Sequence, residues 1–367
     1  MHLTEGFSTV EKVLMAKSSQ KHIPINGSIE LLPLCNMNCD MCYVRLSREE
    51  LEEKGRIRTV EEWMDIARQM KKAGTLFLLL TGGEPLIYPG FKELYVQLQQ
   101  LGMILTINTN GTLIDEEWVA FFKQNKPRRV NITLYGASEK TYSELCHYPG
   151  GFEKAIKGIR LLRDNDIDVK IGGSLTKNNR DEIDQILTIC EELSVPVQID
   201  TYMMPAQRER ELPFCMRSRV SPEEAAKVGM YAFYRESGAE KFQQFSEQMQ
   251  CKIQEMKNGK EYPKGISCYA GNCSYAINWQ GMMQPCVIMN GISISVFEYG
   301  FDEAWKYIVE ETGKLVLNPK CITCHMRPLC RTCPACALYE TGDYNGIPEY
   351  MCQFAEEAFR VMEQKDF

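Results

Sequence analysis

The 367-residue chain lacks the hallmarks of several large protein classes. It has no run of 18 apolar residues, which a membrane-spanning helix needs. Its first 21 residues contain no continuous apolar core, so we expect no signal peptide. No basic tract stands out and the net charge is −7, which argues against nucleic acid and anionic membranes as partners. These absences predict a cytoplasmic protein with a core large enough for one or two domains.

Histidine is scarce and cysteine is abundant. The four histidines, His2, His22, His147 and His325, form no ligand pattern, and His325 is interpreted as a bystander between two cysteines. In a small secreted domain, 16 cysteines would indicate disulfides. In a long chain without an export signal they indicate metal binding in a reducing, low-oxygen cytoplasm.

Three cysteines near the N-terminus carry the most specific signal. Cys35, Cys39 and Cys42 form a Cys-x3-Cys-x2-Cys run directly after an apolar, strand-like stretch. Three thiolates can hold three irons of a [4Fe–4S] cube and leave the fourth iron open for a substrate or cosubstrate. Zinc is the alternative, but structural zinc sites want four ligands, and no histidine or fourth cysteine lies nearby in the sequence.

This spacing resembles the radical S-adenosylmethionine (radical SAM) superfamily, in which the open iron chelates SAM. A second motif, Gly82, Gly83, Glu84 and Pro85, follows the next strand-like run about 40 residues later. The resemblance implies that this segment contacts the SAM amino group, and glycine permits such close backbone approach. The residue before the third cysteine is often aromatic in the family, whereas here it is Met41. Tyr43 could pack on adenine instead.

Strand-like and helical stretches alternate between residues 29 and 202. The apolar, β-branched runs cover 28–34, 75–81, 102–109, 128–135, 167–175 and 195–202. Helical periodicity occupies 59–74, 90–102, 115–124, 151–165 and 181–193. Such alternation predicts an α/β fold with parallel strands, which matches the partial (β/α)6 barrel that the resemblance implies. Both motifs fall at carboxyl ends of strands, where such folds bind ligands.

The region from residue 265 to residue 352 contains nine cysteines. Its NWQGMMQPC segment predicts a hairpin with Gly281 at the turn. A zinc ribbon is the alternative for any one pair. Eight or more thiols without a matching histidine favour two further [4Fe–4S] clusters.

The cysteine pattern here is similar to the SPASM extension of radical SAM proteins. By resemblance, one auxiliary cluster would take Cys268, Cys273, Cys286 and Cys333, and the other Cys321, Cys324, Cys330 and Cys352. Cys336 is an extra cysteine, because the gap after Cys330 is two residues where the extension has three. We therefore expect residues 1–27 as an N-terminal segment, 28–202 as the barrel, 203–264 as a helical linker with two helices, and 265–367 as the SPASM domain with a C-terminal helix.

Further SAM contacts are expected at the ends of the middle strands. The resemblance points to polar residues there, and the candidates are Asn108, Thr109, Thr133 and Ser174, for which strand-end turn polarity is the competing explanation. Cys215, in a loop before the helical pair, is the candidate hydrogen donor or substrate contact. Cys190 and Cys251 lie in helical patterns and are expected to be inert thiols.

SPASM-type proteins mostly modify peptides or proteins by oxidation. We expect three [4Fe–4S] clusters, SAM, a peptide substrate, and an electron donor such as flavodoxin or ferredoxin. The chain has no room for an N-terminal leader-binding domain, so a separate protein would recognise any leader. Formylglycine formation on a sulfatase is the alternative, but that family has an Asp where this chain has Val287. An electron carrier without enzymatic activity would not need the Gly-Gly-Glu motif.

Overall fold

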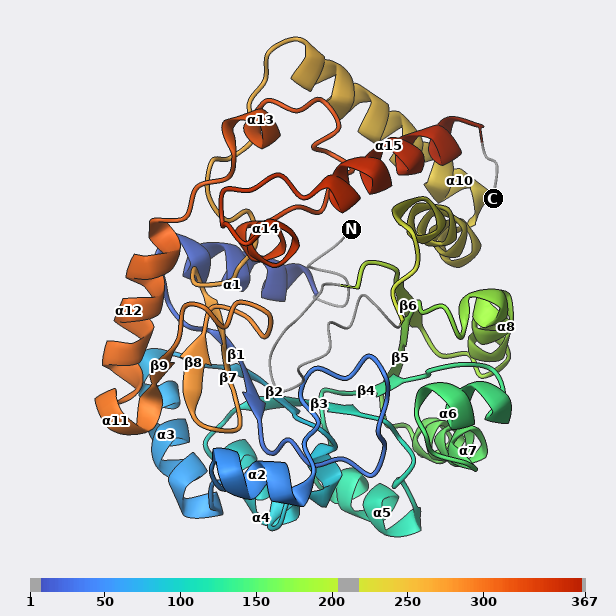
Figure 1. Ribbon diagram of the computed structural model, residues 1–367. Helices are drawn as coiled ribbons and strands as arrows, with labels where there is room; N and C mark the ends of the chain where they lie inside the picture. The colour runs from blue at the N-terminus through green and yellow to red at the C-terminus, as the bar shows by residue number, and fades with distance from the viewer. Residues whose placement is uncertain (1–7, 204–217, 365–367) are drawn as a thin grey trace.

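The protein is built on one nine-stranded sheet, seen in a computed structural model that describes residues 8–203 and 218–364 (Figure 1). The strand order is β6-β5-β4-β3-β2-β1-β7-β8-β9. The first six strands run parallel in sequence order, as alternation of strands and helices predicts. They are β1 (Asn26–Glu30), β2 (Phe77–Thr81), β3 (Ile104–Thr109), β4 (Arg129–Thr133), β5 (Val169–Ser174) and β6 (Val197–Asp200).

Helices follow the strands and form an arc along the outer side of the sheet (Figure 1). The five helices expected between the strands are confirmed, the last of them preceded by the 3-10 turn η2 (Arg180–Glu182). They are α3 (Val60–Ala73), α4 (Phe91–Gln100), α5 (Glu116–Gln124), α7 (Gly151–Arg163) and α8 (Ile183–Glu192). The predicted partial (β/α)6 barrel is therefore the architecture of this region.

The two faces of the parallel sheet differ in polarity. Leu80, Ile107, Ile132 and Ile171 are fully buried on the face that packs against the helices. The residues between them are only half-buried, and many are polar. Because successive side chains along a strand point to opposite faces, this alternation separates an apolar outer face from a polar inner face. The inner face is thus the side available for a ligand.

Three helices before residue 203 were not expected from the sequence. They are α1 (Thr9–Gln20), α2 (Arg48–Lys54) and α6 (Glu139–Leu145). Ser8 and Ser47 each begin a helix with a capping box, in which the serine hydroxyl accepts from a glutamate N–H three residues later. The capping signals are present in the sequence, but the apolar stripes are too short for a period to be detected.

The C-terminal region continues the barrel sheet. Its first strand, β7 (Ser274–Ile277), pairs in parallel with β1, although about 250 residues separate them. The predicted hairpin is confirmed: β7 pairs antiparallel with β8 (Met282–Gln284), and Gly281 in the turn has φ of 89°. The strand β9 (Ile294–Ser295) and helices α11 (Val296–Tyr299) and α12 (Phe301–Gly313) follow.

The remaining helices lie beyond one end of the barrel (Figure 1). The two helices expected after residue 221 are confirmed as halves of α10 (Pro222–Lys257), which Gly238 interrupts with non-helical φ and ψ of 79° and 165°. Helices α13 (Pro319–Ile322), α14 (Pro334–Thr341) and α15 (Glu349–Gln364) complete the chain, and α15 packs along α10. None of the helices in the described ranges is both long and apolar enough to cross a membrane.

Glu62 gives the stability of α3 a defined pH dependence. Its carboxylate accepts from Arg56 Nη1 at 2.8 Å and from the Thr59 N–H at 2.8 Å. The hydrogen bond from Arg56 lowers the pKa of Glu62 to about 2, despite partial burial, and Thr59 and Arg58 also lower it. This folded-state pKa lies below the ordinary value of 4.5. The stabilisation that the Glu62 carboxylate contributes is therefore complete above pH 4.5 and is lost as the pH falls toward 2.

We therefore expect Glu62→Gln to reduce the free energy of unfolding by about 1 kcal/mol at pH 7. The difference from wild type should shrink between pH 4.5 and the lowest pH at which the protein stays folded. Urea unfolding at several pH values measures it, with the exposed Glu53→Gln in α2 as the control. A constant difference across this range would contradict the assignment.

Candidate functional site

Backbone hydrogen bonds bring the two N-terminal motifs together. Beyond the end of β1, the chain continues to pair with the segment that follows β2. The N–H of Leu31 donates to Thr81 O at 2.9 Å, that of Gly83 to Leu32 O at 2.8 Å, and that of Glu84 to Leu34 O at 2.9 Å. The Gly-Gly-Glu segment is therefore bonded to the residues that lead directly into Cys35.

Glycine is required where these two segments meet. A Cβ on Gly83 would lie 2.2 Å from Leu34 O, and one on Gly82 would lie 2.5 Å from Leu32 O. Gly82 also has φ of 141°, a conformation that other residues rarely adopt. Two adjacent glycines are thus required because their backbone contacts the residues that lead into the cysteine loop.

Glu84 is fully buried and holds the end of β3. Its Oε1 accepts from the Thr109 hydroxyl at 2.7 Å and the Leu86 N–H at 3.1 Å, and its Oε2 accepts from the Asn110 N–H at 2.9 Å. Burial raises the pKa of Glu84 to about 7, although these three donors lower it. The carboxylate also begins the 3-10 turn η1 (Pro85–Ile87), in which Pro85 is buried.

The cysteine loop is anchored to the turn that follows α6. The N–H of Asn38 donates to Cys146 O at 3.0 Å and that of Asp40 to Leu145 O at 2.9 Å. The Asp40 carboxylate also lies 2.8 Å from His147 Nε2. These contacts fix the backbone on either side of Cys39.

The three thiols are close enough to affect one another electrostatically. Burial raises the pKa of Cys35 to about 12, and the Glu84 carboxylate and the thiols of Cys42 and Cys39 raise it too. The Met37 N–H donates to Cys35 Sγ at 3.4 Å and the Arg45 N–H to Cys42 Sγ at 3.3 Å.

Three cysteine thiols are the kind of ligand that an iron–sulfur cube takes. Among residues 8–203 and 218–364, no three His, Cys, Asp or Glu side chains converge on a point that one metal ion could fill. A cube distributes its thiolates over separate irons, so its ligands need not converge. Iron binding releases the thiol protons and supplies the positive charge that buried sulfurs require.

Two residues next to these thiols were not expected as site residues. Cys146 is fully buried and hydrogen-bonded to the Cys39 thiol, which together with burial raises the pKa of Cys39. Tyr135, after β4, also hydrogen-bonds to Cys39. Asn110 is a third addition: its Nδ2 lies 3.8 Å from Cys35 Sγ and donates to Asn36 Oδ1 at 2.8 Å. Asn110 and Tyr135 could have been proposed as site residues from the sequence, because they lie just after two of the middle strands.

The expected SAM-binding residues lie in two settings. Asn108, Thr133 and Ser174 are half-buried on the inner face, where the Asn108 Oδ1 accepts from Asn131 Nδ2 at 2.8 Å. Thr109 instead is buried and bonded to Glu84. Tyr43 packs against the small apolar cluster of the cysteine loop, formed by Val44, Leu46, Leu51 and Trp279.

The C-terminal cysteines gather in two groups. The first group joins the ends of the hairpin to the start of α14: Cys268, Cys273, Cys286 and Cys333. Burial raises the pKa of Cys286 to about 12, and the neighbouring thiols of Cys333 and Cys268 add to the effect. Burial likewise raises the pKa of Cys273 to about 12, with Cys268 as its neighbour.

The second group joins α13 and the following loop to α15: Cys321, Cys324, Cys330 and Cys352. Partial burial raises the pKa of Cys352 to about 11, and the thiols of Cys330, Cys321 and Cys324 contribute. Cys336 lies next to the first group: its N–H donates to Cys333 Sγ at 3.4 Å, and its sulfur lies 2.8 Å from the Tyr202 hydroxyl. Cys215 lies outside the described residues.

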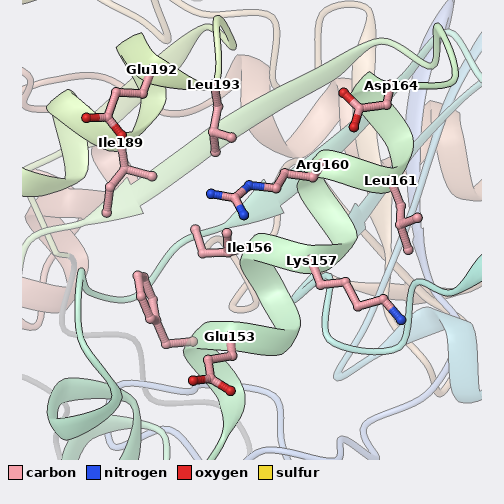
Figure 2. A pocket seen from close by; sticks show the side chains of 10 residues that line it. Glu153, Ile156, Lys157, Arg160, Leu161, Asp164, Ile189, Glu192 and Leu193 are labelled. Atoms are coloured by element: carbon pink, nitrogen blue, oxygen red, sulfur yellow. The ribbon is translucent and has the colours of Figure 1, made fainter.

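A separate hollow of about 400 Å³ lies on the outer side of the barrel between α7 and α8 (Figure 2). Ile156, Leu161 and Ile189 line it together with charged residues such as Arg160 and Glu192. None of the expected site residues lines it. We therefore assign the chemistry to the cysteine loop and the inner face.

Comparison with known proteins agrees with this geometry. Residues 29–190 match the model of the Radical SAM superfamily. The chain is 27% identical over 334 residues to the AdoMet-dependent heme synthase of Methanosarcina barkeri, a match that covers 86% of this chain and 92% of that protein. It is also 27% identical over 187 residues to the sporulation killing factor maturation protein SkfB of Bacillus subtilis, covering 51% of this chain and 44% of that protein.

A solved structure shares the whole architecture. Streptococcus suis SuiB bound to precursor peptide SuiA superposes with a TM-score of 0.66 and 18% identity, covering 93% of this chain and 79% of that chain. At this identity the likeness establishes the fold. The cysteine-rich C-terminus, in turn, fits the SPASM extension.

Gly83→Ala tests the contact between the two motifs. We expect it to lower the free energy of unfolding by about 1–3 kcal/mol, because the new methyl group overlaps a backbone oxygen that cannot move away freely. Chemical denaturation measures the loss. Gly172→Ala is the matched strand control, since its added Cβ would meet nothing within 4 Å. Equal stability of the two variants would refute the close approach.

Proposed function

Because residues 29–190 form a radical SAM domain, we propose that the chain cleaves SAM and uses the resulting 5′-deoxyadenosyl radical to oxidise a peptide. Cys35, Cys39 and Cys42 would hold the [4Fe–4S] cluster. The observation that carries the proposal is the hydrogen-bonded ladder that joins the Gly-Gly-Glu segment to the residues before Cys35. It sets a cluster loop and a ligand-binding turn side by side.

The chain's own residues would bind and orient SAM on the inner face. We assign its methionine part to the backbone of Gly82, Gly83, Glu84 and Pro85, since both Glu84 oxygens are already engaged with donors of this chain. The remaining contacts would come from Asn108, Thr109, Thr133, Ser174 and Tyr43. The half-buried, polar character of the inner face supports this assignment.

We assign the two C-terminal cysteine groups to auxiliary [4Fe–4S] clusters. Cys268, Cys273, Cys286 and Cys333 would hold one, and Cys321, Cys324, Cys330 and Cys352 the other. When bound, the N-terminal cluster supplies one electron to SAM, and an auxiliary cluster accepts one from the substrate. With one hydrogen atom transferred to the 5′-deoxyadenosyl radical and one proton released, the substrate loses two hydrogens in total, as a thioether or carbon–carbon crosslink requires.

Similarity to SkfB, a maturation protein, and to SuiB, which binds a precursor peptide, supports a peptide substrate. Val287 after Cys286 favours a crosslink over formylglycine formation, whose enzymes carry an Asp there by resemblance. Flavodoxin or ferredoxin would supply electrons.

A tetrapyrrole is the second candidate substrate. The match to a heme synthase covers 86% of this chain and 92% of that protein, whereas the SkfB match covers about half of each. Nothing in a shared radical mechanism restricts the hydrogen donor to a peptide. The two candidates therefore differ in the substrate that would bind between the inner face and the C-terminal region: a peptide in one case and a tetrapyrrole in the other.

Mass spectrometry separates these candidates. The reconstituted, reduced protein is incubated with SAM and either any short cysteine-containing peptide found encoded beside its gene or an iron porphyrin that bears propionate side chains. We expect 5′-deoxyadenosine and a peptide lighter by two hydrogens. If only the porphyrin is converted, the peptide is rejected as the substrate and the tetrapyrrole is accepted. Absence of SAM cleavage under all conditions would overturn the function.

Cys146 provides a test of the proposed ligand set. We expect Cys35→Ala, Cys39→Ala and Cys42→Ala each to abolish SAM cleavage. Cys146→Ala should retain the cluster and at least a tenth of the activity, because its thiol touches a ligand but is not one. The comparison uses iron content and 5′-deoxyadenosine yield. Complete loss of the N-terminal cluster in Cys146→Ala would contradict the proposal that three cysteines suffice to hold it.

A further inference from the structure

Arg327 is a buried cation in the middle of the second cysteine group. It lies in the five-residue gap between Cys324 and Cys330, and its side chain is only 3% exposed. Its N–H donates to Cys324 O at 3.1 Å and its Nη1 donates to Cys330 O at 3.4 Å. The guanidinium carbon lies 5.0 Å from the centre of the Tyr262 ring.

Within the described part of the chain, Arg327 has no carboxylate partner. Its Nε is buried and makes no hydrogen bond. The other buried arginine of this region, Arg219, differs because it is paired with the Glu340 carboxylate at 2.5 Å. A buried guanidinium without a counter-charge is strongly destabilising, so the position of Arg327 indicates a negative charge nearby.

The contacts of Arg327 place it within the second cysteine group. The two carbonyls that it bonds belong to Cys324 and Cys330, which are both members of that group. A buried cation is therefore bonded to the backbone that carries two of the group's thiols.

We propose that Arg327 is a counter-charge of the second auxiliary cluster and raises its reduction potential. The proposal rests on the cluster assignment made above. A cube with four thiolate ligands carries net negative charge, and its reduction adds one more electron. A fixed cation nearby stabilises the reduced form more than the oxidised form, which makes the cluster a better electron acceptor. Arg327 is in this sense a positioning charge rather than a catalytic residue.

The position has a consequence for the oxidation chemistry. An auxiliary cluster can accept an electron only if its reduction potential is high enough, and a fixed cation beside the second cluster would raise that potential.

The test measures potentials in the full-length chain that lacks the N-terminal cluster through Cys35→Ala, Cys39→Ala and Cys42→Ala. In this background we expect about eight irons per chain, held by the two cysteine groups. A redox titration followed by electron paramagnetic resonance then gives the auxiliary potentials. Iron content well below this value in the background itself would reject the cluster assignment, independently of Arg327.

With the clusters present, Arg327→Gln should shift the reduction equilibrium of the second auxiliary cluster toward the oxidised form by at least tenfold, equivalent to about 59 mV for one electron. Arg327→Lys should restore most of the shift. The control is Arg331→Gln, because Arg331 also follows Cys330 closely but is part-exposed and paired with Asp200 at 3.2 Å; we expect less than a threefold change. Unchanged potentials in Arg327→Gln, or a shift equal to that of the control, would overturn the proposal.

If Arg327→Gln does not assemble its clusters, iron content tests whether the charge of Arg327 is required. A counter-charge role predicts that Arg327→Lys retains the auxiliary irons while Arg327→Gln and Arg327→Met both lose them. Equal loss in all three variants would show that the shape of arginine, not its charge, is required, and would refute the inference.

Discussion

The continued pairing of the chain after β1 with the chain after β2 is the constraint on which the site depends. Backbone hydrogen bonds from Gly83 and Glu84 reach the carbonyls of Leu32 and Leu34, immediately before the cysteine loop. Only glycine allows this approach, because a side chain on Gly83 would overlap the Leu34 oxygen. The ladder fixes where the cysteine loop begins, and the turn after α6 fixes its middle through Asn38 and Asp40.

The cysteine thiols of the proposed sites are largely buried. Thiols in all three cysteine groups have pKa values raised by burial and by one another, so the folded chain does not favour free thiolates there. Positive charge is needed to stabilise them, and iron supplies it when it binds. Arg327 is the complementary case, a buried cation that needs negative charge. These opposite requirements meet in the C-terminal region.

Local signals predicted much of this architecture. Apolar runs such as that around Leu80 identified all six parallel strands, and Gly281 and Gly238 marked the hairpin and the break in α10. The short helices α2 and α6 escaped prediction because seven residues carry too little periodicity. The pairing of β7 with β1 also escaped it, because no local feature encodes a partner about 250 residues away.

The sequence by itself determined which chemistry the chain can perform, because the spacing of Cys35, Cys39 and Cys42 and the adjacent glycines in Gly82 and Gly83 are local properties. Tertiary structure alone decided how distant residues meet. It placed Cys146 against Cys39, turned the carboxylate of Glu84 toward the end of β3, and buried Arg327 against the carbonyls of Cys324 and Cys330. Such contacts arise from packing and burial, which depend on the whole fold and leave no signature in a short stretch of sequence.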